Sequence, residues 1–428
     1  MRIKRWLFAL SLIVLLTAFA GALCADTSKV REDRYEALKR FSQVLGLVEE
    51  YYVRDVGTKE LMDDAIKGLL QQLDPHSAYM TPEEFRDMQV STSGEFGGIG
   101  IEITLDNGRL VVVSPIEDTP AHKAGLKPGD IILEIDGQPT QDMTLTEAVG
   151  KIRGLKGEAV VLTILHSDSQ KPERISIVRD TIPIISVKSE ELDEGILYLR
   201  LTRFNENTTR ELHDKIKEFS RAKGDPKGVI LDLRNNPGGL LNQAVSVTDT
   251  FLDEGLIVYI QGKDEATRKD YAASAQPLEV SAPMVTLINA GSASASEIVA
   301  GALQDHKRSV ILGDRSFGKG SVQTVIPLAD GSGIKLTTAL YYTPSGRSIQ
   351  AEGIAPDIVL PFEAPRETED RTMLREKDLS RHLHNNSEGT SPEAIERNGS
   401  AKAMLARDNQ LRMALELVRQ LPRLRALK

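Results

Sequence analysis

The sequence predicts a multidomain α/β protein with a helical N-terminal segment, a small β-rich domain, an α/β core and a helical C-terminal tail. Helical hydrophobic spacing near both ends, short strand-like runs over residues 91–180 and alternating strands and helices over 181–362 are the three observations behind this prediction. With 428 residues, 40% hydrophobic and 27% charged, the chain has enough apolar surface for several buried cores, which excludes a wholly disordered protein.

Charge and cysteine content exclude several classes of function. The net charge is −9 and aromatic residues make up 5%, so we expect no nucleic-acid partner. The single cysteine, Cys24, excludes an intramolecular disulfide and a thiolate metal cluster. We therefore expect neither a metal nor another cofactor.

Residues 1–25 have the pattern of a signal peptide or an N-terminal anchor. A basic start, Met1–Arg5, precedes an apolar run from Trp6 to Ala22, and small residues on both sides of Leu23 offer cleavage sites. The run is at the short end for a membrane span. Either alternative predicts an exported chain, periplasmic or anchored to the inner membrane and facing the periplasm.

Residues 26–90 form the predicted helical N-terminal region. Apolar residues recur at three- and four-residue spacing from Phe41 to Val48 and from Leu61 to Leu73. The pattern breaks at Asp74–Ser77, and Thr81 with Pro82 signals a new helix.

Short strands and turn signals fill residues 91–180. The expected strands are Ile99–Leu105, Leu110–Val113, Ile131–Ile135 and Ala159–Leu165. One helix is expected over Thr144–Ile152.

Strands and helices alternate over residues 181–362. The expected strands are Leu197–Thr202, Val229–Leu233, Ile257–Ile260, Met284–Ile288 and Val310–Leu312, with helices near 207–221, 240–252 and 295–304. Residues 363–400 read as a polar linker, and 401–428 hold a last helix, Met404–Leu421. Its apolar stripe is expected to dock on the body of the protein or on a second copy.

A glycine-rich stretch, Phe96–Ile101, precedes one of the strands. Its backbone N–H groups can point into one concavity that suits an anion such as a chain-terminal carboxylate. We take Gly98, Ile99, Gly100 and Ile101 as the candidate carboxylate-binding residues, with Ile99 and Ile101 lining a pocket for the last side chain. The alternative is a glycine-rich bulge without a ligand.

A serine-rich run, Gly291–Glu297, lies between an apolar strand and a helix. This position places backbone N–H groups and the positive helix end beside a hydroxyl, as an oxyanion requires. Ser292, Ser294 and Ser296 are all candidates. The alternative is a capping box, because Glu297 follows Ser294 by three residues.

The candidate base for such a serine is a lysine. None of the seven histidines lies in a recognisable nucleophile or metal pattern. Lys319 lies between two glycines, Phe317 and Val322 could bury it, and Gln323 could hold its amine. The alternatives are an exposed loop lysine and a phosphate-binding loop, which would need Ser or Thr where Gly320 stands.

Another glycine turn, Gly238-Gly239, follows the strand that ends near Leu233. An amide of this pair could donate to an oxyanion beside Ala295, although an ordinary turn between strand and helix has the same glycines.

The longer motifs resemble known families. Ser114–Ala121, Ala124–Ile132 and Ile135–Gly137 resemble a PDZ domain, which implies binding of a peptide C-terminus. From about Leu38 to Leu360 the chain resembles the carboxyl-terminal processing (tail-specific) serine peptidases. The matching motifs are Leu73–Ser77, Leu233–Gly239, Gly291–Glu297, Phe317–Gln323, Tyr342–Gln350 and Pro356-Asp357.

The resemblance implies a residue assignment. It makes Ser294 the nucleophile, Lys319 the general base and Gln323 the residue that orients Lys319, with oxyanion donors at Ala295 and in Gly238-Gly239. It implies a serine endopeptidase that recognises apolar C-terminal tails of exported proteins and cleaves near them, with a PDZ domain that can gate the site. We also expect a homo-oligomer and possible membrane attachment through the N-terminal segment. A non-catalytic PDZ scaffold is the alternative.

Overall fold

The structure is a computed structural model that describes residues 32–106, 108–166, 169, 171–193, 195–274, 280–363 and 399–425. The predicted signal or anchor segment and most of the polar linker lie outside these residues. Among the described helices, none is long and apolar enough to cross a membrane. The chain divides into two compact units, Met1–Tyr79 with Ile334–Leu336, and Met80–Gly333 with Thr337–Lys428.

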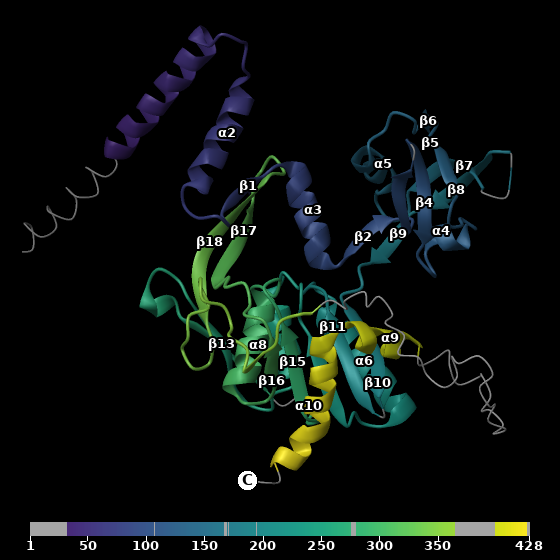
Figure 1. The fold of residues 1–428 in the computed structure, drawn as a ribbon. Helices are drawn as coiled ribbons and strands as arrows, with labels where there is room; N and C mark the ends of the chain where they lie inside the picture. The colour runs from purple at the N-terminus through teal and green to yellow at the C-terminus, as the bar shows by residue number, and fades with distance from the viewer. Residues whose placement is uncertain are drawn as a thin grey trace, which may run out of the picture. The chain divides into compact units, whose positions relative to one another are not determined.

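The first unit is helical, as predicted (Figure 1). A helix over residues 32–51 precedes α2 (Thr58–Gln71). The chain then turns at Asp74, whose carboxylate accepts the backbone N–H groups of His76 at 2.8 Å and Ser77 at 2.9 Å. This side-chain turn explains why the helix stops there and β1 (Ala78–Met80) follows.

The second unit begins with α3 (Pro82–Ser93), which Thr81 and Glu84 cap reciprocally. A β-rich domain follows, with its sheet in the order β3-β4-β5-β7-β8 and β6 paired to β5. Its strands are β3 (Ile101–Asp106), β4 (Arg109–Pro115), β5 (Ile131–Ile135), β6 (Gln138–Pro139), β7 (Ala159–Leu165) and β8 (Glu173–Val178). Its helices are α4 (Pro120–Lys123) and α5 (Leu145–Ile152). A separate pair, β2 (Glu95–Gly98) and β9 (Asp180–Pro183), connects this domain to its neighbours in the chain.

The α/β core is built on a six-stranded sheet in the order β10-β11-β12-β15-β16-β19. The strands are β10 (Val187–Asp193), β11 (Ile196–Leu201), β12 (Gly228–Asp232), β15 (Met284–Ile288), β16 (Val310–Gly313) and β19 (Ile358–Val359). Only the edge strand β10 pairs antiparallel; all other pairs in this sheet are parallel. The carboxyl ends of β12, β15 and β16 therefore lie side by side.

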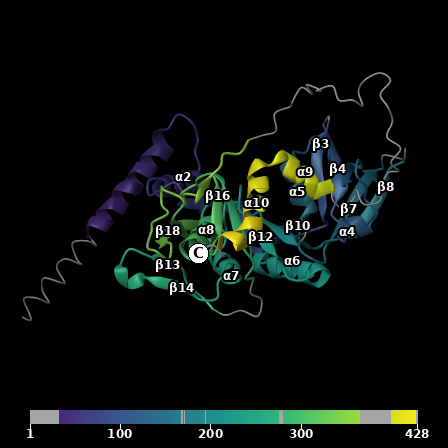
Figure 2. The same cartoon turned by 60° about the horizontal axis from the view of Figure 1, so that its bottom comes forward.

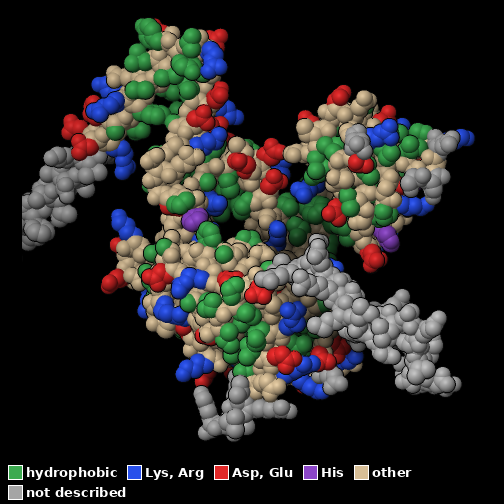
Figure 3. All heavy atoms as spheres, viewed as in Figure 1, with side chains coloured by type: hydrophobic (Ala, Val, Ile, Leu, Met, Phe, Trp, Pro, Cys, Tyr) green, Lys and Arg blue, Asp and Glu red, His purple; other side chains and the backbone are tan. Residues whose placement is uncertain are grey.

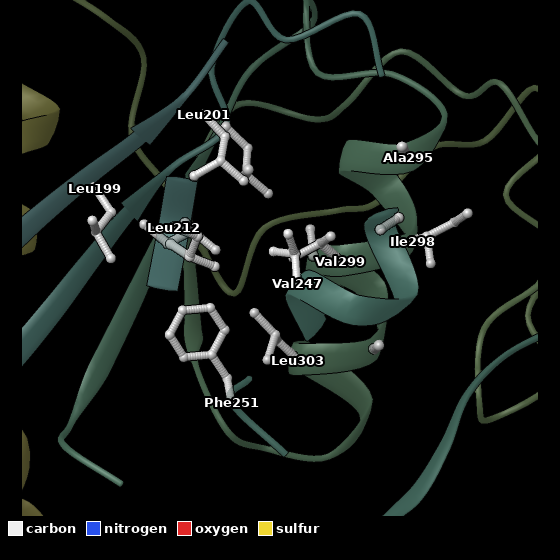
Figure 4. Packing of buried hydrophobic residues seen from close by; sticks show 14 of the residues in the cluster. Leu199, Leu201, Leu212, Val247, Phe251, Ala295, Ile298, Val299 and Leu303 are labelled. Carbon is white, nitrogen blue, oxygen red and sulfur yellow. The ribbon is translucent and has the colours of Figure 1, made fainter. Parts of the chain in front are cut away.

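Helices cover both faces of this sheet (Figure 2). On one face α6 (Thr208–Lys223), α7 (Leu241–Asp249) and α8 (Ala295–Asp305) bury a large apolar cluster (Figure 4). On the other face α9 (Gly399–Arg407) and α10 (Asn409–Arg425) do the same. Alternate strand residues explain this, because Leu197 and Leu199 face the first cluster while Tyr198 faces the second.

The C-terminal apolar stripe packs on the body of the protein, which is one of the two alternatives expected from the sequence. Leu411, Ala414, Leu415 and Val418 are buried against the sheet. The prediction of a single helix over Met404–Leu421 is wrong in one respect, since the helix is interrupted at Asp408 and α10 starts at Asn409. The reason is a cap, in which the Asp408 carboxylate accepts the N–H of Leu411 at 2.9 Å.

A second sheet, in the order β1-β18-β13-β14 with β17 paired to β18, completes the fold. Its remaining strands are β13 (Gly255–Gln261), β14 (Lys269–Ala273), β17 (Ser321–Pro327) and β18 (Gly333–Tyr342), and a short 3-10 turn, η1 (Glu265–Thr267), joins β13 to β14. The hairpin of β17 and β18 begins directly after Lys319 and Gly320.

Candidate active site

Three of the sequence motifs meet at one edge of the core sheet. The Leu233–Gly239 loop leaves the carboxyl end of β12, the serine-rich run follows β15, and the lysine loop follows β16. Because these strands are adjacent and parallel, their loops are neighbours in space although they are far apart in sequence. This edge is where open α/β sheets place their ligands.

The first two loops are joined by asparagines. Asn289 donates its side-chain amide to Asn235 at 2.9 Å and accepts the Asn235 backbone N–H at 2.9 Å. The Asn236 carbonyl accepts the backbone N–H of Ala293 at 3.0 Å. The serine-rich run is therefore held on both sides by the loop after β12.

Ser294 has a strained backbone at the start of α8. Its φ of 55° and ψ of −112° are outside the regions that residues with a Cβ normally occupy. Such strain costs of order 1–3 kcal/mol and persists only where the surroundings impose it, which is typical of functional sites. The side chain is half-buried at the positive end of the helix.

The structure distinguishes the three candidate serines by what their hydroxyls do. Ser292 is fully buried and donates to the Leu233 carbonyl at 2.8 Å, and Ser296 is fully buried and donates to the Asn236 carbonyl at 3.0 Å. Both therefore fasten the two loops together. Ser294 is the half-buried residue of the three, whereas the other two are fully buried.

Glu297 links the serine to the lysine loop, a role that the sequence analysis missed. Its carboxylate is fully buried and accepts the backbone N–H of Ser294 at 2.7 Å, as expected for the capping alternative. The same oxygen, Oε2, accepts the N–H of Lys319 at 2.9 Å. The other oxygen accepts the Gly318 N–H and the Ser316 hydroxyl, both at 2.6 Å. One carboxylate thus holds the backbones of Ser294 and Lys319 side by side.

These bonds argue against a phosphate-binding loop. Such a loop points its backbone N–H groups at phosphate oxygens. Here the amides of Gly318 and Lys319 are already bound to a carboxylate, whose charge would repel a phosphate.

The lysine loop departs from one expectation about Lys319. Lys319 is half-buried, but Phe317 does not cover it, because the Phe317 side chain is 62% exposed. The reason is that the loop turns its amides inward, with the Phe317 N–H donated to the Ser292 carbonyl at 3.0 Å. Val322 packs against the apolar core of the α/β domain.

Gln323, on β17, is oriented by its own neighbours. Its Nε2 donates to the hydroxyl of Ser321 at 2.9 Å and approaches that of Thr337 at 3.4 Å. Nε2 also donates to the Ser321 backbone carbonyl at 3.3 Å, and because a carbonyl only accepts, Oε1 is the acceptor end of the amide.

Gly238 lies directly against Ser294 and Ala295. A Cβ at this position would lie 2.8 Å from the Ser294 Cβ and 3.0 Å from the Ala295 nitrogen, and its φ is +97°, so only glycine fits. The Gly238 N–H is donated to Asn236 at 2.9 Å. Within the described part of the chain, the Gly239 and Ala295 N–H groups have no acceptor.

Arg234 anchors the loop after β12 from the other face of the sheet and was also missed. Its guanidinium binds Asp232 at 2.7 Å, Asp408 at 2.7 Å and Gln410 at 2.9 Å. Burial alone would lower the pKa of Arg234, but the two carboxylates outweigh burial and raise it. The C-terminal helices are therefore bonded to the loop that carries Gly238.

The glycine-rich stretch of the β-rich domain differs partly from the expectation. Ile99 has no exposed surface and belongs to the core of the domain, so it lines no open pocket. The reason is that the Ile99 carbonyl accepts the Ala121 N–H at 2.8 Å, which turns the side chain inward. Gly98 and Gly100 are buried backbone positions and Ile101 is half-buried.

No group of three or more metal-binding side chains occurs among the described residues. The groups that the structure brings to this sheet edge are Ser294, the backbone of Lys319 and the N–H groups of Gly239 and Ala295. That set suits acyl transfer by a nucleophile with backbone stabilisation of an oxyanion.

Comparison with known proteins gives the same direction. Residues 195–360 match peptidase family S41, residues 111–165 match a PDZ domain, and residues 19–84 match the activating protease CtpB N-terminal domain. A carboxy-terminal-processing protease of Bartonella bacilliformis is 46% identical over 389 residues, covering 90% of this chain and 89% of the relative. The carboxy-terminal processing protease CtpA of Bacillus subtilis is 37% identical over 353 residues, covering 82% and 74%.

A solved photosystem II D1 C-terminal processing protease is also similar, at 32% identity and a TM-score of 0.43, over 75% of this chain and 92% of that one. The family match over residues 111–165 identifies the β-rich domain as a PDZ domain, as its sequence predicted. The chain belongs to the carboxy-terminal-processing proteases, serine-type peptidases of family S41.

Proposed function

We propose that the protein is an endopeptidase in which Ser294 and Lys319 form a catalytic dyad. Neutral Lys319 takes the Ser294 proton, the Oγ–carbon bond forms, and the carbonyl becomes an oxyanion. Lys319 passes the proton to the leaving amine as the carbon–nitrogen bond breaks. Water then attacks the ester carbon and gives its proton to Lys319, and that proton returns to Ser294 Oγ as the Oγ–carbon bond breaks and the new carboxylate is released.

The observation that carries the proposal is the shared carboxylate of Glu297. It accepts the backbone N–H groups of Ser294 and Lys319 on one oxygen atom. A lysine acts as a base only where its charge is poorly solvated, and Lys319 is half-buried on an inward-turned loop.

The remaining roles follow from which atoms are already bonded. We assign the oxyanion donors to the N–H groups of Ala295 and Gly239, since the Gly238 N–H is donated to Asn236. We assign Gln323 Oε1 as the atom that orients Lys319, since Nε2 is directed at Ser321 and Thr337.

Purified full-length enzyme tests the dyad. An apolar-tailed protein is incubated with wild type, Ser294→Ala, Lys319→Ala and Lys319→Arg, and the products are identified by mass spectrometry. All three variants should be slower than wild type by at least about 10³-fold. The first lacks the nucleophile, the second lacks the base, and the guanidinium of Lys319→Arg stays protonated and cannot accept a proton. The exposed Ser281 provides the matched control, Ser281→Ala, which should cleave normally. Cleavage by Ser294→Ala at the wild-type rate would contradict the proposal.

The PDZ domain is proposed to bind the free C-terminus of an exported protein through backbone N–H groups near Gly98 to Ile101. A peptide substrate with a free carboxylate and the same peptide with a C-terminal amide differ only in that charge. Amidation should raise KM by about tenfold or more. Equal KM values for the two peptides would show that the carboxylate is not recognised.

Self-association is proposed through the helix over residues 32–51. This helix exposes an apolar series in which Leu38 is 62% and Val44 is 54% exposed, and hydrophobic side chains gather over this unit (Figure 3). A second copy is the proposed occupant, since the stripe of α10 is already buried in its own body. Sedimentation should show the oligomer dissociating in Leu38→Glu/Val44→Glu, and an unchanged mass would contradict this surface.

Export itself is tested by fractionating cells that produce the full chain.

A further inference from the structure

Tyr341 is a buried polar residue that the proposed dyad does not use. It lies near the end of β18 and is 2% exposed. Its hydroxyl has no hydrogen-bond partner within the described part of the protein. A buried hydroxyl without a partner costs about 1–3 kcal/mol, so its presence in a core calls for an explanation.

The surroundings of this hydroxyl supply the explanation. The Ser294 side chain and the Glu297 carboxylate both influence the pKa of this hydroxyl, and both are parts of the candidate active site. The Tyr341 backbone N–H donates to the Gly320 carbonyl at 2.9 Å, directly beside Lys319. The backbone of Tyr341 is therefore fixed beside the lysine loop, and its buried hydroxyl lies within range of Ser294 and Glu297.

The phenol remains a donor over the whole working pH range. Burial raises the pKa of Tyr341, the negative charge of Glu297 raises it further, and the Ser294 side chain opposes this only in part. Deprotonation would place a second negative charge near Glu297 in a buried space.

We propose that Tyr341 is a further catalytic residue, whose hydroxyl donates a hydrogen bond to Ser294 Oγ when substrate is bound. The proposal rests on Ser294 being the nucleophile. A serine hydroxyl has one donor and two acceptor lone pairs. Once its proton is on Lys319 the oxygen has three lone pairs, of which one faces the Lys319 ammonium, one is bound to Tyr341 and the third is aimed at the scissile carbonyl.

No proton leaves Tyr341 in this role. The same hydrogen bond acts again when the acyl ester is hydrolysed, because Ser294 Oγ is then the leaving group and carries developing negative charge. A donor aimed at developing charge stabilises the transition state more than the ground state.

Tyr341→Phe tests this, with Tyr342→Phe as the matched control. Adjacent strand residues point to opposite faces, and the Tyr342 ring stacks on Tyr259 at 4.9 Å between centroids. Both variants lose one phenolic oxygen from β18. Calorimetry gives the melting temperature, and kcat and KM are measured per folded enzyme, alongside Ser294→Ala.

In Tyr341→Phe we expect kcat to be about 10- to 100-fold lower and KM to be unchanged. The melting temperature should be the same as or higher than that of the wild type, because a buried hydroxyl without a partner is removed. Tyr342→Phe should keep the wild-type kcat. A Tyr341→Phe kcat within twofold of wild type, with Ser294→Ala inactive, would overturn the role of Tyr341 and leave the dyad standing. Cleavage by Ser294→Ala would overturn the dyad, and the role of Tyr341 with it.

Discussion

Glu297→Gln should destabilise the core and abolish cleavage, although the two side chains have nearly the same shape. The carboxylate accepts four hydrogen bonds, two on each oxygen. Gln has one carbonyl oxygen and an NH₂ group that only donates. An NH₂ in place of Oε2 leaves the backbone N–H groups of Ser294 and Lys319 facing another donor, whereas an NH₂ in place of Oε1 leaves only the Gly318 N–H so, because the Ser316 hydroxyl can turn and accept from it.

The magnitude follows from the less costly orientation, in which the Gly318 N–H is the donor that loses its acceptor. A buried donor left without an acceptor costs about 1–3 kcal/mol. Neutralising the buried charge recovers part of its desolvation cost, so we expect the lower half of this range, about 1–2 kcal/mol. At about 2–4 °C per kcal/mol for a domain of this size, the melting temperature should fall by about 2–8 °C.

Calorimetry and the mass-spectrometric cleavage assay measure both consequences on the same samples. Glu218→Gln is the control, since Glu218 is exposed on α6 and pairs with Lys215 at 3.0 Å. It should change the melting temperature by less than about 1 °C. A Glu297→Gln protein that melts with wild type and cleaves at the wild-type rate would refute the bridging role of Glu297.

Asp408→Ala removes two acceptors of the Arg234 guanidinium and the cap of α10, so the free energy of unfolding measured in urea should fall by about 2–4 kcal/mol. Limited proteolysis should cut the variant first at the segment that precedes α10. An unchanged urea midpoint would show that Asp408 contributes nothing. His213 concerns acid stability, because burial, followed by the charge of Lys217, lowers its pKa. The unfolded state then binds the proton more tightly, so stability is lost as the pH falls from about 6.5 through the folded-state pKa. The urea midpoint of His213→Gln should fall less than that of wild type between pH 7.5 and 5.5, and equal falls would contradict this.

Regular elements with a strong local signal were predictable from the sequence. The strands Ile131–Ile135, Ala159–Leu165 and Met284–Ile288 have the predicted bounds, because β-branched runs end at clear turn signals. Helix α5 starts at Leu145, one residue after the predicted start, because Thr144 caps it together with Glu147. The alternation of strands and helices predicted the α/β core.

Contacts between distant segments had no comparable signal. The spacing of Ser294 and Glu297 predicted a cap, but the other donors to Glu297 come from residues 316–319, which no periodicity connects to it. Ile99 failed for a related reason, since an apolar residue beside glycines can face a pocket or the core. The tertiary packing decides this, because Ile99 is buried in the apolar core of the β-rich domain.

The C-terminal helices belong to the framework of the site although they lie on the sheet face opposite α8. Consecutive residues of the loop after β12 bind different parts of the structure. Arg234 binds Asp408 and Gln410 on the α10 side, Asn235 binds Asn289, and Asn236 accepts from Ala293. Gly238 then lies against Ser294. A loop of so few residues cannot release Arg234 without moving Gly238, so a change that frees α10 should alter the oxyanion side of the site as well as stability.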